Sequence, residues 1–185
     1  MKQLLFHPFR RIAGYSALLI GLVFMAAAAL VAYCNGCHFD GALDIHTGLT
    51  NPLWSYFFEA LVAWLPLVLI FFITAKLFSR SRIRFIDIAG TMAMSRWPML
   101  PAALFCFLPM PLPGQNGNIA AGIIGVLGLL ACSIWMVALM YQAYTVSAHL
   151  SGKKAIWSFV CALILSEFIT KLIAVKLASV YTLNF

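Results

Sequence analysis

Long apolar runs alternate with short polar segments along the whole chain, and this pattern predicts membrane-spanning helices. A helix rises 1.5 Å per residue, so about 20 apolar residues cross the hydrocarbon core of a bilayer. Helices are favoured because every backbone N–H and C=O in lipid must find a partner within the protein. The pattern predicts an all-α bundle, a single membrane domain over residues 1–185 with five spans at approximately 13–33, 53–78, 86–108, 119–146 and 155–178.

The third predicted span is irregular. Only residues 97–108 form an uninterrupted apolar run, so the span needs residues 86–95 to cross the bilayer. It then contains Arg96, Pro98 and Pro101. Because proline removes a backbone donor and clashes with the preceding turn, we expect this helix to bend or break near Arg96.

Composition and charge support the membrane class and suggest an orientation. Apolar residues make up 64% of the chain and charged residues 9%, which leaves too little polar surface for a water-soluble domain. The net charge of +7 lies in short segments between apolar runs, a distribution that does not favour a nucleic-acid surface. The positive-inside rule places the N-terminus in the cytoplasm and the C-terminus outside, because with five spans all the basic segments fall on one side: Lys2, Arg10 and Arg11; Lys76, Arg80, Arg82 and Arg84; Lys153 and Lys154.

Small residues at helical spacing mark the fourth span. Gly122, Gly125 and Gly128 recur along one apolar run. We expect them to let a neighbouring helix approach closely, as small residues do in membrane bundles. They are not read as a phosphate-binding loop, because no basic residue lies near them.

The segment after the first span has the spacing Cys34-x-x-Cys37-His38, which is used for covalent haem attachment. Three readings stay open for it. Cys34 and Cys37 could anchor a haem with His38 as an axial ligand, they could form a disulfide or redox pair outside the cell, or they could have no special chemistry. The short polar loop lacks an apolar pocket for a haem. The cysteines within spans, Cys106, Cys132 and Cys161, are interpreted as small packing residues.

Ionisable residues inside the predicted spans indicate where the bundle needs internal partners, since each is costly in hydrocarbon when alone. Arg96 and Glu167 lie at about the same depth, and we expect them to form a buried pair. Glu59 and Lys171 lie at a second common depth and form a second candidate pair. The alternative is that Glu59 and Lys171 reach the membrane interface instead.

Catalytic and metal-binding constellations are missing from the sequence. It contains no paired histidines at helical spacing, no phosphate-binding loop followed by lysine, and no Ser/His/Asp set on a common face. We therefore expect a protein that is not an enzyme and that holds neither a metal nor a cofactor.

Two stretches resemble the Ypt-interacting-protein (Yip) domain family of five-span membrane proteins. They are RFIDIAGTMAMSRWPMLPAAL (84–104) and YQAYTVSAHLSGKKAIW (141–157), and the matching features are Phe85, Asp87, Gly90, Ser95, the Pro98/Pro101 pair and Ser151 to Lys154. The resemblance implies a bundle in the endoplasmic reticulum or Golgi membrane for eukaryotic members, which bind small GTPases through a longer N-terminal region. Only about a dozen residues precede the first span here, so the chain looks more like the compact prokaryotic members, which implies a cell inner membrane.

The leading hypothesis is a non-enzymatic membrane scaffold or adaptor. Its expected partners are membrane lipids, through the basic loops, and other membrane proteins; homo-oligomers are left open, and no nucleic acid is expected. The first alternative is a small transporter or channel subunit with a polar site at Arg96 and Glu167. The second is a membrane-anchored c-type haem electron carrier that uses Cys34, Cys37 and His38.

Overall fold

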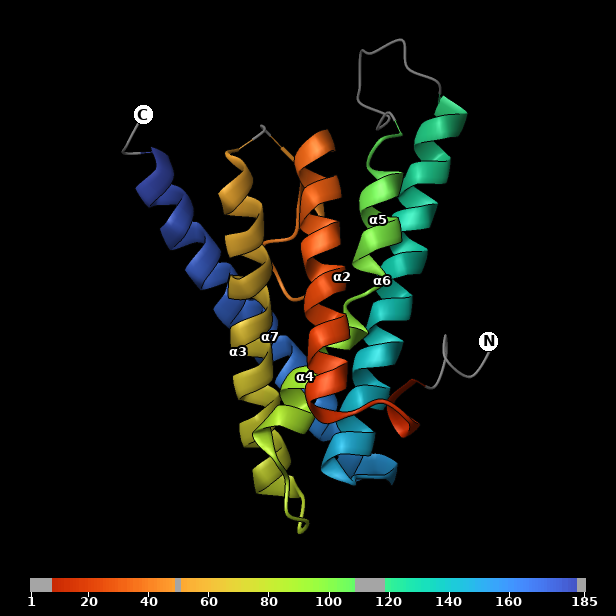
Figure 1. Cartoon of the computed structure of the whole chain (residues 1–185), viewed down its shortest axis with the longest axis vertical. Coiled ribbons are helices and arrows are strands. Elements are labelled where there is room, and N and C mark those ends of the chain that lie inside the picture. Colours follow the sequence, from red (N-terminus) through yellow and green to blue (C-terminus); the bar gives the residue numbers. More distant parts are fainter. Residues whose placement is uncertain (1–7, 49–50, 109–118, 183–185) are drawn as a thin grey trace.

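The computed structural model describes residues 8–48, 51–108 and 119–182. Within them the chain is almost entirely helical (Figure 1). The elements are η1 (Pro8–Arg10), α2 (Gly14–Asn35), β1 (Cys37–His38), β2 (His46–Thr47), α3 (Leu53–Phe78), α4 (Phe85–Ser95), α5 (Met99–Phe105), α6 (Ile119–Ala148) and α7 (Gly152–Thr182). The predicted all-α class is confirmed.

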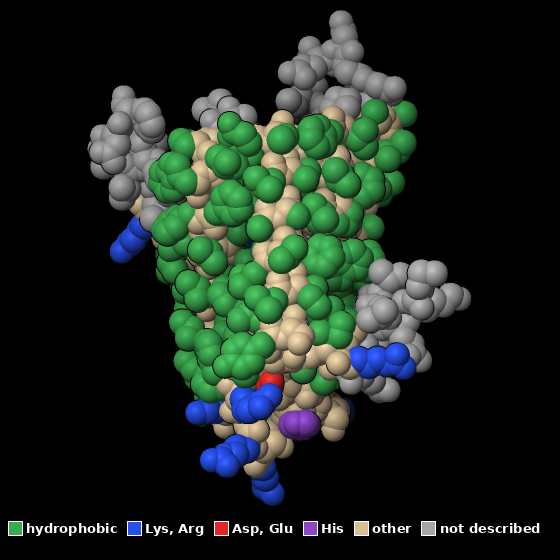
Figure 2. Space-filling model, viewed as in Figure 1, with side chains coloured by type: hydrophobic (Ala, Val, Ile, Leu, Met, Phe, Trp, Pro, Cys, Tyr) green, Lys and Arg blue, Asp and Glu red, His purple; other side chains and the backbone are tan. Residues whose placement is uncertain are grey.

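Four of these helices, α2, α3, α6 and α7, are long and apolar enough to cross a membrane. Their outer faces carry exposed leucine, isoleucine and valine side chains, such as Leu19 on α2, Ile73 on α3 and Ile134 on α6. In Figure 2 apolar side chains cover most of the visible face, and lysine and arginine gather below it. A surface of this kind fits a hydrocarbon environment better than water.

The third predicted span consists of two shorter helices. α4 and α5 follow one another along the bundle and are separated by the turn Arg96–Pro98 (Figure 1). The break lies where the sequence predicts it. Pro98 has no N–H to donate, and the turn is instead closed by short-range bonds such as Met99 N–H to Arg96 O at 2.9 Å.

Backbone contact joins α2 to α4. A Cβ added at Gly21 would lie 2.4 Å from the carbonyl carbon of Ala93, and one at Gly90 would lie 2.4 Å from the backbone oxygen of Gly14. Glycine is therefore required on both helices, as in other close helix crossings in membranes. Spacing along the sequence predicts close contact at the glycines of α6 instead, and no pattern singles out Gly21.

Gly125 and Gly128 of α6 face the end of α5 and the residues that follow it. A Cβ at Gly125 would lie 3.3 Å from the Cβ of Leu108, whereas one at Gly128 would lie 2.5 Å from the Phe105 ring. The expectation of close helix contact thus holds for Gly128, where an aromatic ring rather than a backbone fills the space.

The connection between α2 and α3 turns back into the bundle (Figure 1). Gly36 ends α2 in a left-handed conformation, with φ 66°, and β1 then pairs antiparallel with β2, matching Cys37 with Thr47. Residues 39–45 form the tip of this hairpin, with Phe39 and Ala42 buried. We call residues 36–48 the first loop. It lies between helices for which the sequence predicts direct side-chain contacts.

Candidate functional site

Arg96 is the largest side chain that is almost wholly buried, with 1% of its surface exposed. The turn between α4 and α5 directs its guanidinium toward the tip of the first loop. Nη1 donates to the Ala42 carbonyl at 3.3 Å and Nη2 to the Gly41 carbonyl at 3.4 Å. A buried cation needs such acceptors, and here the backbone of the loop supplies them.

Glu167 holds the same loop from α7. Its Oε2 accepts a hydrogen bond from the backbone N–H of Leu43 at 2.9 Å. The cation on α4–α5 thus binds the carbonyls of residues 41 and 42, and the anion on α7 binds the N–H of the next residue.

The predicted direct pair of Arg96 and Glu167 needs correction. The two side chains reach the same loop tip, as their matched depth predicts, but no ion pair joins them among the described residues. Backbone groups of residues 41–43 stand in their place as partners. Both charges therefore act through the loop.

The predicted pair of Glu59 and Lys171 is also wrong, because each binds the first loop. Both carboxylate oxygens of Glu59 lie within hydrogen-bond distance of His38 Nδ1, at 3.1 and 3.0 Å. The Lys171 ammonium donates to Asp40 at 3.2 Å and also to Asp44. The loop lies between the two helices and supplies an imidazole partner to Glu59 and two carboxylate partners to Lys171.

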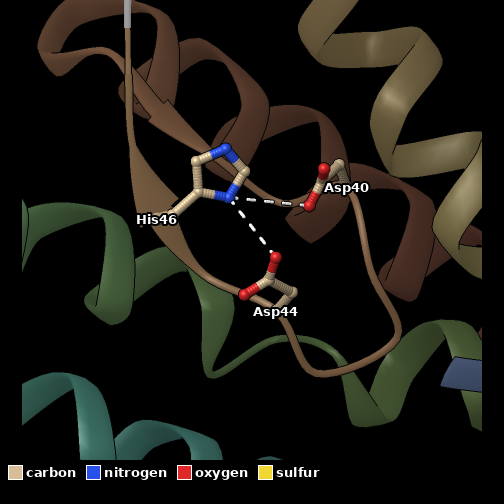
Figure 3. Close-up of side chains that lie close together, drawn as sticks. All are labelled: Asp40, Asp44 and His46. Carbon is tan, nitrogen blue, oxygen red and sulfur yellow. Dashed lines mark ion pairs between the residues drawn. The ribbon is translucent and has the colours of Figure 1, made fainter. Parts of the chain in front are cut away.

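His46 lies beside Asp40 and Asp44 and forms a polar cluster with them in the first loop (Figure 3). Its Nδ1 faces Asp40 at 3.6 Å and Asp44 at 3.4 Å, and 47% of the side chain is exposed. Its ring stacks on His38 with centroids 5.5 Å apart, and His38 stacks in turn on Tyr56 at 4.8 Å. Ligand atoms of Asp40, Asp44 and His46 lie within 4.8 Å of one another, close enough to share a metal ion, but Lys171 already supplies a cation to both carboxylates.

The environment of Asp44 lowers its pKa. Burial raises the pKa of this carboxyl group, but the hydrogen bond and charge of Lys171, with smaller contributions from Asp40 and His46, outweigh burial and bring the pKa below its ordinary 3.8. The ionised form of Asp44 is thus favoured in the folded protein.

This shift predicts how Asp44 contributes to stability as pH changes. Because the folded pKa is the lower one, the contribution is fully present above pH 3.8 and is lost as pH falls through the folded pKa. Asp44→Asn should lower the free energy of unfolding in detergent at pH 6 by on the order of 0.5 kcal/mol, as for a partly exposed pair, and should lower the unfolding temperature with it. The difference from wild type should shrink in acid. In a Lys171→Gln background that shrinkage should largely disappear, and an undiminished difference at low pH would contradict the assignment.

The residues of the Cys34-x-x-Cys37-His38 motif face different surroundings. Cys34 is exposed, whereas Cys37 is buried with its sulfur 2.7 Å from that of Cys106, and His38 binds Glu59. The structure therefore does not bring Cys34 and Cys37 together as a disulfide, nor does it present them side by side as haem anchors. From sequence alone, Cys106 is interpreted as a packing residue. Its position at the far end of the third span nevertheless matches the depth of Cys37, which is the signal for their contact.

The sequence does not predict the first loop as the partner of the buried charges. From sequence alone, residues 34–51 are interpreted as a polar external loop. A signal was present in the sequence of the loop, since Phe39, Ala42, Leu43 and Ile45 are apolar. The structure adds that Gly41 has room only for a hydrogen, because a Cβ there would lie 2.8 Å from Glu167 Oε1. An apolar, tightly packed loop is more typical of a buried segment than of a solvated one.

Comparison with known proteins adds no relative to this picture. No family model, no curated protein and no solved structure matches the chain. The resemblance to the Yip-domain family therefore stays a prediction. What the site does chemically is bind a returning loop by charge-assisted hydrogen bonds, with Lys171 and His46 at its partly exposed edge.

Proposed function

We propose that this protein is a five-span, non-enzymatic membrane scaffold of the Yip-domain type. α4 and α5 together form the third of the five spans, the N-terminus lies in the cytoplasm, and the C-terminus lies outside. The membrane is the cell inner membrane of a prokaryote, with the endoplasmic reticulum or Golgi membrane as the alternative. The scaffold acts through contacts of its helices and cytoplasmic loops with lipids and with other membrane proteins, including further copies of itself.

The observation that carries this proposal is that the charges inside the bundle are used to hold the chain together. Arg96 and Glu167 bind the loop backbone, and Glu59 and Lys171 bind loop side chains. A transport pathway needs polar groups that can exchange partners with a substrate. Groups already bonded to a buried loop suit a structural role better.

The basic residues lie at the opposite end of the bundle. Lys154 at the start of α7 lies over the ring of Phe78 at the end of α3, 5.8 Å from its centroid, which brings two basic segments together. Their exposed side chains are Lys76, Arg80, Arg82, Arg84, Lys153 and Lys154. Lysine and arginine crowd this end in Figure 2. This face fits anionic headgroups or an acidic protein surface on the cytoplasmic side.

The orientation makes a testable prediction. A reporter active only in the cytoplasm should work when fused at the N-terminus or after Ser81, and should fail when inserted at Asn116 or fused at the C-terminus. Reporters at the two termini must therefore give opposite results. Equal activity at both termini would show that the chain crosses the membrane an even number of times.

The scaffold role is tested by site-specific photocrosslinking in native membranes. A crosslinker at Arg82, exposed in the α3–α4 loop, should give discrete protein adducts that mass spectrometry identifies. One at Ile134, exposed on the apolar face of α6, is the matched control for lipid-facing positions. With the crosslinker kept at position 82, the charge variant Arg80→Gln/Lys153→Gln should lose the adducts without losing its fold. Absence of protein adducts at the basic loops in wild type would count against a scaffold.

A small transporter or channel subunit is the second candidate, favoured by the partly exposed edge of the polar cluster. His46 and Lys171 are 47% and 39% exposed beside two carboxylates. Purified protein in liposomes should then carry ions or small charged solutes, and Arg96→Met should abolish the flux. The scaffold proposal expects no flux above that of empty liposomes. Among the described residues, no contact favours the haem carrier over these two.

A further inference from the structure

Two cysteine thiols meet at the end of the bundle opposite the basic loops. Cys37 begins the first loop and is fully buried, and Cys106 follows α5 and is 8% exposed. Their sulfurs lie 2.7 Å apart although the residues are 69 positions apart in sequence. A disulfide holds its sulfurs at about 2.05 Å, so a small side-chain movement separates this contact from a bond. We propose that Cys37 and Cys106 form a disulfide that fastens the first loop to α5.

The backbone around the two thiols holds them in place independently of the sulfur contact. The Asn35 side chain donates from Nδ2 to the Ala103 carbonyl at 2.5 Å, and its Oδ1 accepts the N–H of Cys37 at 3.0 Å. Cys106 lies three positions after Ala103, on the same side of the helix. Asn35 thus brings the start of the loop to the turn of α5 that carries the second cysteine.

The remaining cysteines do not compete for this bond. Cys34 is exposed on α2, Cys161 is exposed on α7, and Cys132 is buried in α6 without a sulfur contact among the described residues. Among the described cysteines, Cys106 is therefore the one positioned to bond with Cys37.

Formation of the bond is a two-electron oxidation. The two thiols lose two protons and two electrons, and one S–S bond forms. The oxidant is a disulfide-bearing protein or small molecule: one thiolate attacks its disulfide to give a mixed disulfide, the second thiolate displaces it, and the oxidant leaves as a dithiol. The step rests on the proposed orientation, which places the pair on the outer side, where such oxidants act. Since the folded pair is buried, oxidation takes place before the loop packs.

The disulfide would secure one arm of the loop whose tip binds Arg96 and Glu167. Closing a long segment of chain restricts the unfolded protein, so reduction should lower the unfolding temperature, by about 5–10 °C. Cys34→Ser should leave this temperature unchanged, which makes it the matched control.

The test uses the full chain in its native membrane. Free thiols are blocked with N-ethylmaleimide under denaturing conditions, the sample is reduced, and a maleimide–polyethylene glycol reagent is added. Wild type should gain two labels after reduction, as should Cys34→Ser, whereas Cys37→Ser and Cys106→Ser should gain none. A non-reduced digest of wild type, which depends on no variant, should contain the peptide pair that joins Cys37 to Cys106. No gain of label, or a linked pair containing Cys34, overturns the proposal.

A second arm separates failure of the disulfide from failure of the proposed orientation. Detergent-solubilised, reduced protein is treated with oxidised glutathione during refolding of the loop from mild denaturant. The same peptide pair should form whichever way the chain lies in the membrane. If the topology reporters are inverted, the orientation and the oxidising compartment fail together; if the reporters agree and the pair does not form here, the disulfide alone is wrong.

Discussion

Replacing Arg96 with methionine is expected to destabilise the folded bundle by about 3 kcal/mol or more, because the carbonyls of Gly41 and Ala42 would stay buried without donors. Glu167 would also lose its favourable electrostatic interaction with the guanidinium. Thermal unfolding in detergent measures the effect. Arg84→Met is the matched control, since Arg84 is exposed in its pair with Asp87 and its loss should leave the unfolding temperature unchanged.

The position of the loop gives a second, independent readout of Arg96. Ala42 is fully buried at the loop tip. In a Cys34→Ser/Cys161→Ser chain, which lacks the exposed native cysteines, Ala42→Cys should resist a water-soluble maleimide. With Arg96→Met added to that chain, Cys at position 42 should react. Arg96→Lys should give an intermediate result, because a single ammonium does not reproduce the two-pronged contact of the guanidinium. A protected cysteine in the Arg96→Met chain would show that the loop is held by other contacts.

Coupling between Arg96 and Glu167 follows from their shared loop rather than from direct contact. Arg96→Met removes the hydrogen bonds to residues 41 and 42, so the loop is already partly released. The hydrogen bond from Leu43 to Glu167 then contributes less to stability. The loss in the double variant Arg96→Met/Glu167→Gln should therefore be smaller than the sum of the single losses. Additive losses would mean that the two residues act independently. Folded single variants that lose only function would favour the transporter.

Gly21→Ala should have the next largest effect, a destabilisation of about 2–3 kcal/mol. The added Cβ would lie 2.4 Å from backbone atoms of Ala93 and Met94, which no side-chain rotation can relieve. α2 and α4 would have to separate. Gly90→Ala should behave alike, because its Cβ would meet the backbone oxygen of Gly14 at 2.4 Å.

Gly125→Ala is the matched control for these glycines. The substitution is the same and also lies in a helix, but the nearest atoms to the new Cβ would be the Leu108 Cβ and the Phe105 backbone oxygen, at 3.3 and 3.5 Å. The higher helix propensity of alanine should offset most of this crowding. Thermal unfolding of Gly21→Ala, Gly90→Ala and Gly125→Ala under the same conditions tests whether α2 and α4 are in close backbone contact. Similar losses at Gly21 and Gly125 would contradict close backbone contact between α2 and α4.

The sequence by itself determined the helices. Span bounds at Leu53 and Ile119 agree with the structure, and so does the break at Arg96. These features depend on local composition: apolar length determines where a helix can lie in lipid, and proline interrupts hydrogen bonding within its own turn. The clustering of basic residues in short loops is equally local.

Only the tertiary structure decided which groups meet. Counting residues along a span gives the depth of Arg96, Glu167, Glu59 and Lys171, but not the direction each side chain faces around its helix or what lies between them. The interposed partner is a loop whose backbone N–H and C=O groups occur in every residue and so leave no mark in a sequence. The contact of Cys37 with Cys106 has the same origin, because packing brings together positions far apart in the chain while local pattern determines only the elements that pack.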